Sequence, residues 1–265
     1  MSSTYSLLWR SGLLNVTAVA RRELGAYWVS PLSWVLGIGF VAVISFYGYL
    51  QGVVLARLAS MDSIFSTVVL LTLFGVPLLT KRLLAEERRS GMAELLFTTP
   101  VRSWELVVGK WLGAYIFYLV GIAFTFVYVG LVSELLPNGA ALRLFGLALP
   151  IANLDYGLVV GGYVGLAALG AMTMAIGMLA SSLVRSQEAA ALLGMAALLL
   201  LWYVGEAAFW LRPPLGPFLD AAAAANRFAS FPRGQIAVAD LTYFVTVTVG
   251  ALFVTTRVVA SRTWR

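Results

Sequence analysis

The 265-residue sequence contains no cysteine and no histidine, and only 11% of its residues are charged. The two absences exclude disulfides, thiol nucleophiles and imidazole bases, and they remove the usual ligands of zinc and haem. We therefore expect no metal site. A soluble domain carries about a quarter charged residues, so this chain has too little charge to form a surface that water solvates. We expect lipid to be its main solvent.

Acidic residues are also scarce, since 12 Asp and Glu stand against 18 Lys and Arg for a net charge of +6. In a soluble protein such an excess would suggest nucleic acid. In a membrane protein, basic residues gathered in cytoplasmic loops explain it more simply, and we expect no nucleic-acid partner. The first apolar run starts near Pro31, behind a charged amphipathic stretch. We therefore expect no secretory signal peptide.

Six stretches are apolar enough for transmembrane helices, each of which needs about 20 such residues. They are residues 31–54, 64–79, 107–131, 156–179, 189–211 and 241–258. The second is the shortest. The sequence thus predicts an all-α polytopic membrane protein, with a cytoplasmic N-terminus at 1–30, a six-helix domain at 31–258 and a C-terminal tail at 259–265.

The distribution of basic residues predicts the orientation of these spans. Segments 1–30, 80–110, 181–188 and 257–265 lie on one side and hold 13 of the 18 Lys and Arg residues. Since the basic side of a membrane protein is normally cytoplasmic, we expect both termini in the cytoplasm.

A helix that lies in the membrane interface is predicted before the first span. Apolar side chains recur there at spacings of three and four, namely Leu13, Val16, Ala20, Leu24 and Tyr27. Arg21, Arg22 and Glu23 fall away from that face, and Tyr27 with Trp28 would lie at headgroup depth. A simple juxtamembrane anchor is the alternative.

Two loops on the non-cytoplasmic side are long. Residues 132–155 contain Pro137, Asn138, Gly139 and Pro150, which are typical of turns. Residues 212–240 are apolar enough to dip back toward the membrane.

The loop between spans two and three has the most informative pattern. Residues 81–89 are expected to carry the second helix into water, and Ser90 with Gly91 suits a break and a new helix start. Glu94 then lies near the positive end of a short helix, and Pro100 ends it. Met92, Leu95 and Leu96 share one face. The pattern alone leaves open whether this face binds a partner or packs against the chain's own spans.

The segment from Leu84 to Pro100 resembles the coupling helix of ABC-2 type permeases, in particular the branch that includes gliding-motility permeases and the permease of nitrous-oxide reductase maturation. Residues 153–157, 180–183 with Gln187, 231–234 and 240–244 also match, in chain order. Met92 stands where the family often has threonine, which puts only side-chain detail in doubt.

The resemblance implies a multi-pass protein of the cell (inner) membrane that pairs with a second permease copy, as a homodimer or heterodimer, and with ABC-type ATPase subunits. The short helix would dock in the ATPase, and the N-terminal helix would be the connecting helix with Arg21, Arg22 and Glu23. The coupling residues would be Glu87, Arg88, Gly91, Met92, Glu94, Leu95, Leu96, Thr98 and Thr99. Consistently, the sequence has no G-x-x-x-x-G-K-[ST] phosphate loop. ATP and magnesium would be bound by the partner, and we expect no cofactor and no catalytic residue in this chain.

A few polar residues are candidates for a substrate path or an outer gate. Glu206 is the acidic residue within the fifth stretch, where it could line a path, pair with Arg212 or with an arginine of the last outer loop, or bind a proton. A position near the outer interface is the favoured alternative, because depth lowers the cost of the charge. Asp155 with Tyr156, and Arg233 with Asp240, could form a gate, although charged helix ends are commonly caps.

The sequence thus favours a transporter subunit that couples an external ATPase to export or to force transmission. One variant is mechanical signalling to an extracytoplasmic accessory protein. A passive channel is a rival, but it would need rings of polar residues. A hydrolytic intramembrane enzyme is disfavoured by the absence of histidine and cysteine.

Overall fold

Six long apolar helices form the body of the molecule. The computed structural model describes residues 2–56, 60–89, 102–134, 141–144, 147–150, 156–208 and 215–263. Within them, the helices long and apolar enough to cross a membrane are Pro31–Leu55, Asp62–Ala85, Ser103–Val132, Gly157–Leu183, Gln187–Ala207 and Val238–Ser261. The predicted all-α, six-span architecture is confirmed.

The first half of the chain begins with α1 (Ser2–Val29), followed by α2 (Pro31–Val43) and the π-helix η1 (Ile44–Leu55). Proline at the first position of α2 fits a helix start, because its missing N–H would have no intrahelical partner there. The next helices are α3 (Asp62–Thr80) and α4 (Arg82–Arg89), separated by Lys81 alone. The second span is therefore not short: it continues into the first turn of α4.

The second half of the chain supplies the remaining spans. The third consists of α6 (Ser103–Phe124) and α7 (Phe126–Glu134), the fourth is α8 (Tyr156–Leu183) and the fifth is α9 (Gln187–Ala208). Short helices α10 (Leu215–Ala222) and α11 (Ala224–Phe228) precede the last span, α12 (Val238–Thr263).

The fourth span is the central helix of the bundle. Among the six, α8 is the most buried, and it packs against α3, α6, α9 and α12. Small residues allow this close packing: a Cβ at Gly165 would collide with Phe231, and one at Gly177 with Thr80. Large buried side chains such as Leu166, Met172 and Phe231 fill the space between the helices.

The two long outer loops contain structure that the sequence analysis did not predict. An antiparallel hairpin lies where turns were expected, with β1 (Ala141–Leu144) paired to β2 (Leu147–Pro150). Pro150 is the last residue of β2, not part of a turn, and a strand end tolerates its missing N–H. Helices α10 and α11 lie against α9, in line with the expectation that residues 212–240 return toward the membrane.

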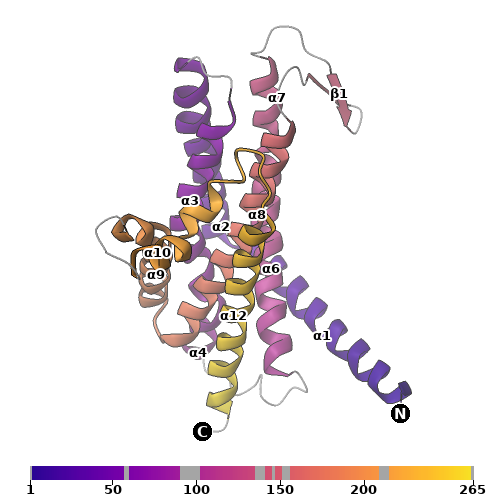
Figure 1. Ribbon diagram of the computed structural model, residues 1–265. Coiled ribbons are helices and arrows are strands. Elements are labelled where there is room, and N and C mark those ends of the chain that lie inside the picture. The colour runs from indigo at the N-terminus through magenta and orange to yellow at the C-terminus, as the bar shows by residue number, and fades with distance from the viewer. Residues whose placement is uncertain are drawn as a thin grey trace.

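The elements separate clearly along the long axis of the molecule. In Figure 1 α4 and the C-terminus lie at one end, and the hairpin lies at the other. Helix α1 projects sideways near the α4 end. The distribution of basic residues predicts that the α4 end is the cytoplasmic one.

Candidate functional site

The predicted coupling segment is bracketed by two described helices. Glu87 and Arg88 belong to α4, although their side chains lie outside the described part of the structure. The other predicted coupling residues lie outside the described residues altogether: Gly91, Met92, Glu94, Leu95, Leu96, Thr98 and Thr99. The candidate site is therefore formed by the elements on either side of this segment, namely the α3–α4 junction and the start of α6.

The first turn of α4 is buried, not extended into water as the sequence analysis expected. Leu83, Leu84 and Ala85 are each at most 5% exposed and pack against α8 and α9. The mixed charges of this segment suggested a solvated helix. The first turn is buried despite these charges, because its three apolar residues pack against the cytoplasmic end of α8.

A single hydroxyl joins α8 to the α3–α4 junction. The Oγ of Ser181, a fully buried residue, accepts hydrogen bonds from the backbone N–H groups of Leu84 at 3.2 Å and Ala85 at 3.1 Å. It donates to the carbonyl oxygen of Lys81 at 3.0 Å. The first N–H groups of a helix have no partner within it, and here a side chain from another span supplies the cap. All three hydrogen-bonding capacities of the hydroxyl are used.

A buried ion pair joins α1 and α6 to the start of α4. Lys110 on α6 is 3% exposed, and its Nζ lies 2.8 Å from Oε1 of Glu23 on α1. The same Nζ donates to the carbonyl oxygen of Leu83 on α4 at 2.8 Å. The ammonium group therefore connects α1, α4 and α6. Removing the ammonium group would leave the carboxylate of Glu23 without this cation at a site with little solvent.

The predicted polar and apolar faces of the N-terminal helix need one correction each. Arg21 and Arg22 are exposed as expected, but the Glu23 side chain is only 13% exposed because it turns toward Lys110. Leu13, expected on the apolar face, is 59% exposed, whereas Val16, Ala20 and Tyr27 are buried. The pattern of α1 alone could not show that a charged partner on α6 would make burial of Glu23 favourable.

Helices α1 and α6 approach closely along this contact. A Cβ at Gly109 would lie 2.7 Å from Cβ of Val19, and one at Gly113 would lie 2.8 Å from the carbonyl oxygen of Ala20. Glu105, in the first turn of α6, is 4% exposed and accepts hydrogen bonds from the side chain of Asn15 and the backbone N–H of Arg102. The chain that leaves the coupling segment is thus fixed directly to α1.

Tyr27 ties the end of α1 to the end of α3. Its hydroxyl donates to the carbonyl oxygen of Leu79 at 3.0 Å, and the guanidinium of Arg82 lies 4.4 Å from its ring centroid. Tyr27 is 1% exposed because neighbouring helices cover it, whereas Trp28 is 42% exposed, and their position at headgroup depth stays a prediction. Burial raises the pKa of the Tyr27 phenol, and the positive charge of Arg82 acts in the opposite direction. The phenol therefore remains a neutral hydrogen-bond donor at physiological pH.

We call these contacts the cytoplasmic junction, defined by Glu23, Tyr27, Glu105, Lys110 and Ser181. It links α1, α3, α4, α6 and α8 immediately beside the predicted coupling segment. A movement of that segment would therefore reach three transmembrane helices through short, buried polar contacts. The sequence analysis had noted residues 180–183 but gave no role to Ser181, Lys110 or Glu105.

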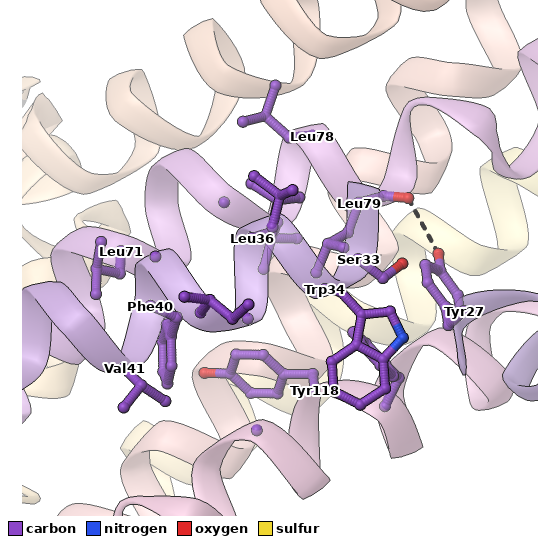
Figure 2. A pocket seen from close by; sticks show the side chains of 18 of the residues that line it. Tyr27, Ser33, Trp34, Leu36, Phe40, Val41, Leu71, Leu78, Leu79 and Tyr118 are labelled. Atoms are coloured by element: carbon purple, nitrogen blue, oxygen red, sulfur yellow. Dashed lines mark hydrogen bonds between the residues drawn. The ribbon is translucent and has the colours of Figure 1, made fainter. Parts of the chain in front are cut away.

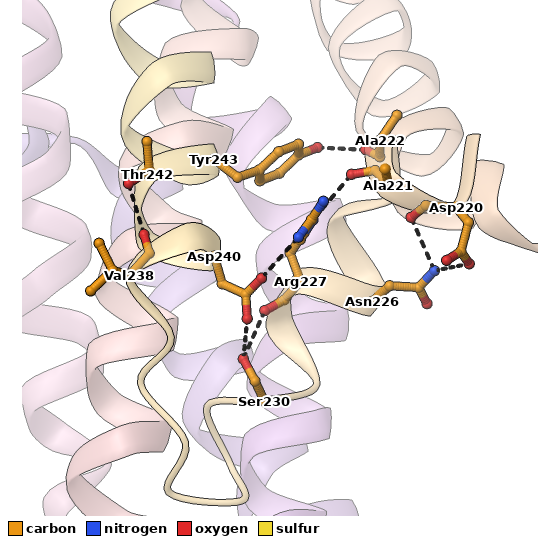
Figure 3. A network of polar contacts seen from close by, with 10 residues as sticks. All are labelled: Asp220, Ala221, Ala222, Asn226, Arg227, Ser230, Val238, Asp240, Thr242 and Tyr243. Carbon is orange, nitrogen blue, oxygen red and sulfur yellow. Dashed lines mark hydrogen bonds and ion pairs between the residues drawn. The ribbon is translucent and has the colours of Figure 1, made fainter. Parts of the chain in front are cut away.

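The predicted outer-gate residues do not form one group in the described part of the structure. Asp155 lies outside it, and Tyr156 begins α8 with a side chain that is not described. Arg233 is exposed in the turn after α11. Asp240 is 9% exposed and pairs instead with Arg227, at 3.3 Å, a residue that the sequence analysis had not selected (Figure 3).

The Asp240 contacts fasten the last outer loop to the start of α12. Ser230 donates to Asp240 at 2.7 Å, and Arg227 also donates to the carbonyl oxygen of Ala221 at 3.1 Å. Tyr243 on α12 donates to the carbonyl oxygen of Ala222 at 2.6 Å. All of these contacts join residues of the last outer loop to one another or to the first turns of α12, so their role is structural.

Glu206 lies near the end of α9, within the fifth span and exposed on its surface. The described residues give its carboxylate no hydrogen-bond or ion-pair partner. Arg212, its suggested partner, lies outside them. The role of Glu206 stays a prediction.

Comparison with known families identifies one match. A family model described as ABC-2 family transporter protein matches residues 57–205, which is more than half of the chain. The matched range runs from before α3 to near the end of α9, and it includes the predicted coupling segment and most of the cytoplasmic junction. A search of curated proteins gives no match.

Proposed function

Since the chain belongs to the ABC-2 transporter family, we propose that it is the transmembrane subunit of an ATP-driven transporter whose ATPase is a separate polypeptide. The family and the six apolar helices make it a multi-pass permease of the cell membrane. The finer proposal is that residues 91–99 dock on the ATPase, which binds ATP and magnesium. A second permease copy, identical or related, would complete the membrane pore.

The cytoplasmic junction is the observation that carries this proposal. A docking segment can transmit force only if its two ends are firmly attached to the spans. At one end Ser181 and Lys110 hold the start of α4, and at the other Glu105 holds the start of α6. The bonds to α4 are buried, where an unmade polar contact is costly, and the bond at the start of α6 is partly buried. A push on the segment would therefore move α1, α6 and α8 together rather than bend a loose loop.

Mechanical signalling is a second candidate function, favoured by the β1–β2 hairpin. The hairpin lies at the end of the molecule opposite to α4 (Figure 1). Its placement gives the chain an outer element that could press on an extracytoplasmic protein. In this variant the same ATP-driven movement would produce force outside the cell without transport of a solute.

The proposal is tested by purification of the tagged chain from native membranes in mild detergent. We expect an ABC-type ATPase in fixed proportion to the permease. The variants Leu95→Asp and Gly91→Pro should release the ATPase, because a charge or a helix break would disrupt the docking face. Both variants should remain folded by circular dichroism, since the spans are unchanged.

Ser186→Asp is the matched control for these variants. Ser186 is exposed in the cytoplasmic bend before α9, and its Oγ caps the N–H of Ala189. Aspartate caps a helix equally well, so the variant adds a negative charge on the same side without loss of structure. Full ATPase capture by Leu95→Asp and Gly91→Pro would contradict the coupling assignment. A wild-type chain that never carries an ATPase would favour a passive channel.

A further inference from the structure

An apolar groove of about 770 Å³ runs along α2, α3 and α6 in the cytoplasmic half of the spans. Figure 2 shows Leu36, Phe40 and Val41 of α2 beside Leu71 and Leu78 of α3, with Tyr118 of α6 below them. The groove exists because α2 packs sparsely on its neighbours: its span is only 17% buried, the lowest share of the six. The helix stands away from α3 and α6 and leaves a long concave surface.

Glycines from all three helices line the groove. They are Gly37 and Gly39 on α2, Gly75 on α3 and Gly121 on α6. A Cβ added at any of the four would meet no atom within 4 Å. They therefore differ from Gly113 and Gly165, whose missing side chains make room for a neighbouring helix. Among the described residues, no side chain fills the space above the groove glycines.

The cytoplasmic mouth of the groove carries an unpaired polar group. Ser33 lines it and is 4% exposed, yet its hydroxyl makes no hydrogen bond to any described residue. Serine and threonine in a helix usually bond to the carbonyl four residues earlier, as Ser45 does to Val41. For Ser33 that position is Val29, which lies in α1 before the break at Ser30, so the hydroxyl stays available.

The N-terminus of α2 opens at the same mouth. Ser30 makes no side-chain cap there, and the first turn contains no acidic residue. Pro31 has no N–H, and the N–H groups of Ser33 and Trp34 donate to the carbonyl oxygen of Ser30, so the first-turn N–H that makes no hydrogen bond to a described residue is that of Leu32. This N–H and the helix dipole favour an anion at such a position. Trp28 and Trp34 lie beside it, joined by a hydrogen bond from Trp34 Nε1 to the carbonyl oxygen of Trp28 at 2.9 Å. Tryptophan is the residue most typical of headgroup depth.

We propose that this groove binds one phospholipid of the cytoplasmic leaflet. The acyl chains lie over the groove glycines, and the phosphate accepts hydrogen bonds from the hydroxyl of Ser33 and from the N–H of Leu32. The groove follows α2 from Ser33 to Val43, which is about 15 Å of helix. That length equals about half of the 30 Å hydrocarbon core, the depth of one leaflet.

The polar mouth of the groove favours a lipid over a helix from a second copy. A helix would leave the hydroxyl of Ser33 and the N–H of Leu32 without an anionic partner, whereas a phospholipid satisfies the apolar body and the polar mouth together. The proposal does not depend on an ATPase partner.

The test uses the wild-type chain in vesicles of phosphatidylethanolamine and phosphatidylglycerol that contain a phosphatidylglycerol with a photoreactive diazirine in one acyl chain. After illumination, labelled peptides are mapped by mass spectrometry. The double variant Gly75→Leu, Gly121→Leu fills the groove. Its control is Gly250→Leu on α12, where an added Cβ likewise meets no atom within 4 Å. Leucine favours a helix more than glycine does, so all three substitutions should fold.

We expect label concentrated on the groove faces of α2, α3 and α6, a several-fold loss in the double variant, and no loss in Gly250→Leu. Ser33→Ala should weaken capture of the anionic lipid roughly tenfold, as expected for one hydrogen bond to a charged group. Equal labelling of the exposed face of α12 would overturn the proposal. So would efficient disulfide formation between two copies through Gly75→Cys in this cysteine-free chain, because a second copy would then occupy the groove.

Discussion

At the scale of single residues, the cytoplasmic junction depends on polar groups that are almost completely removed from solvent. Ser181, Lys110 and Glu105 are each less than 5% exposed, and each bonds to at least two groups on other elements or at a helix start. In such surroundings a satisfied bond contributes modestly, but an unsatisfied donor costs about 1–3 kcal/mol. The junction is therefore sensitive to single substitutions that leave the spans intact.

Ser181→Ala should lower the free energy of unfolding by about 2 kcal/mol more than Ser182→Ala. The first change leaves the buried N–H groups of Leu84 and Ala85 without an acceptor. The second removes only a bond from Ser182 to the carbonyl of Leu179 in its own helix. Both serines are fully buried, so the pair is matched in position and volume. Denaturant titration in detergent measures the difference, and equal losses would contradict the assigned cap.

The Lys110–Glu23 pair should behave as a coupled unit. Lys110→Met alone should cost about 3–5 kcal/mol, because it leaves the carboxylate of Glu23 without its cation, and Glu23→Gln should cost less, because Lys110 keeps its hydrogen bond to Leu83. The double variant should lose clearly less than the sum of the two single losses. A double-mutant cycle on unfolding free energies measures this coupling, and simple additivity would show that the two charges do not interact.

The residues of the junction illustrate the limit of sequence analysis at this scale. Glu23 looked like part of a polar face because its partner, Lys110, is 87 positions away. Asp240 was assigned to a gate with Arg233, but Arg227 pairs with it because α11 and its turn bring that side chain to the start of α12. Choosing among several basic residues in one loop requires the path of the backbone, which no local pattern contains.

At the scale of elements, the contact of α1 with α6 depends on glycines. Gly113→Ala should destabilise the protein and loosen α1, since a methyl group there would lie 2.8 Å from a carbonyl oxygen of α1. Gly121→Ala on the same helix has open space and should be neutral, or stabilising by up to about 1 kcal/mol through helix propensity. Thermal unfolding and protease cleavage within α1 measure both effects. A Gly113→Ala protein as stable and as protease-resistant as Gly121→Ala would argue against close helix packing.

Elements were easier to predict from the sequence than contacts were. All six spans were located, because a run of about 20 apolar residues has few alternatives to a membrane helix. The second span was predicted to end at residue 79, yet it continues to Ala85, since Lys81 and Arg82 interrupt the apolar run but not the helix. The β1–β2 hairpin was missed because Pro137 and Gly139 before it and Pro150 at its end indicated turns.

At the scale of the whole molecule, the helices at the cytoplasmic end are joined to one another, whereas the first span packs loosely on its neighbours. Helices α1, α3, α4, α6 and α8 are joined by the cytoplasmic junction. The span formed by α2 and η1 is the least buried of the six. Force applied at residues 90–101 should therefore move the joined helices relative to α2, and such relative movement is what an ATP-driven permease requires.

The most direct test of this account is a distance measurement in the complex with its ATPase. The chain has no cysteine, so spin labels can be placed at Arg185→Cys, beyond the end of α8, and at Val35→Cys, on the exposed face of α2. We expect the distance between the labels to shift when ATP is trapped, and we expect Ser181→Ala to abolish the shift while the bound ATPase still hydrolyses ATP. No shift in the wild-type complex, or an undiminished shift in Ser181→Ala, would contradict transmission through the cytoplasmic junction.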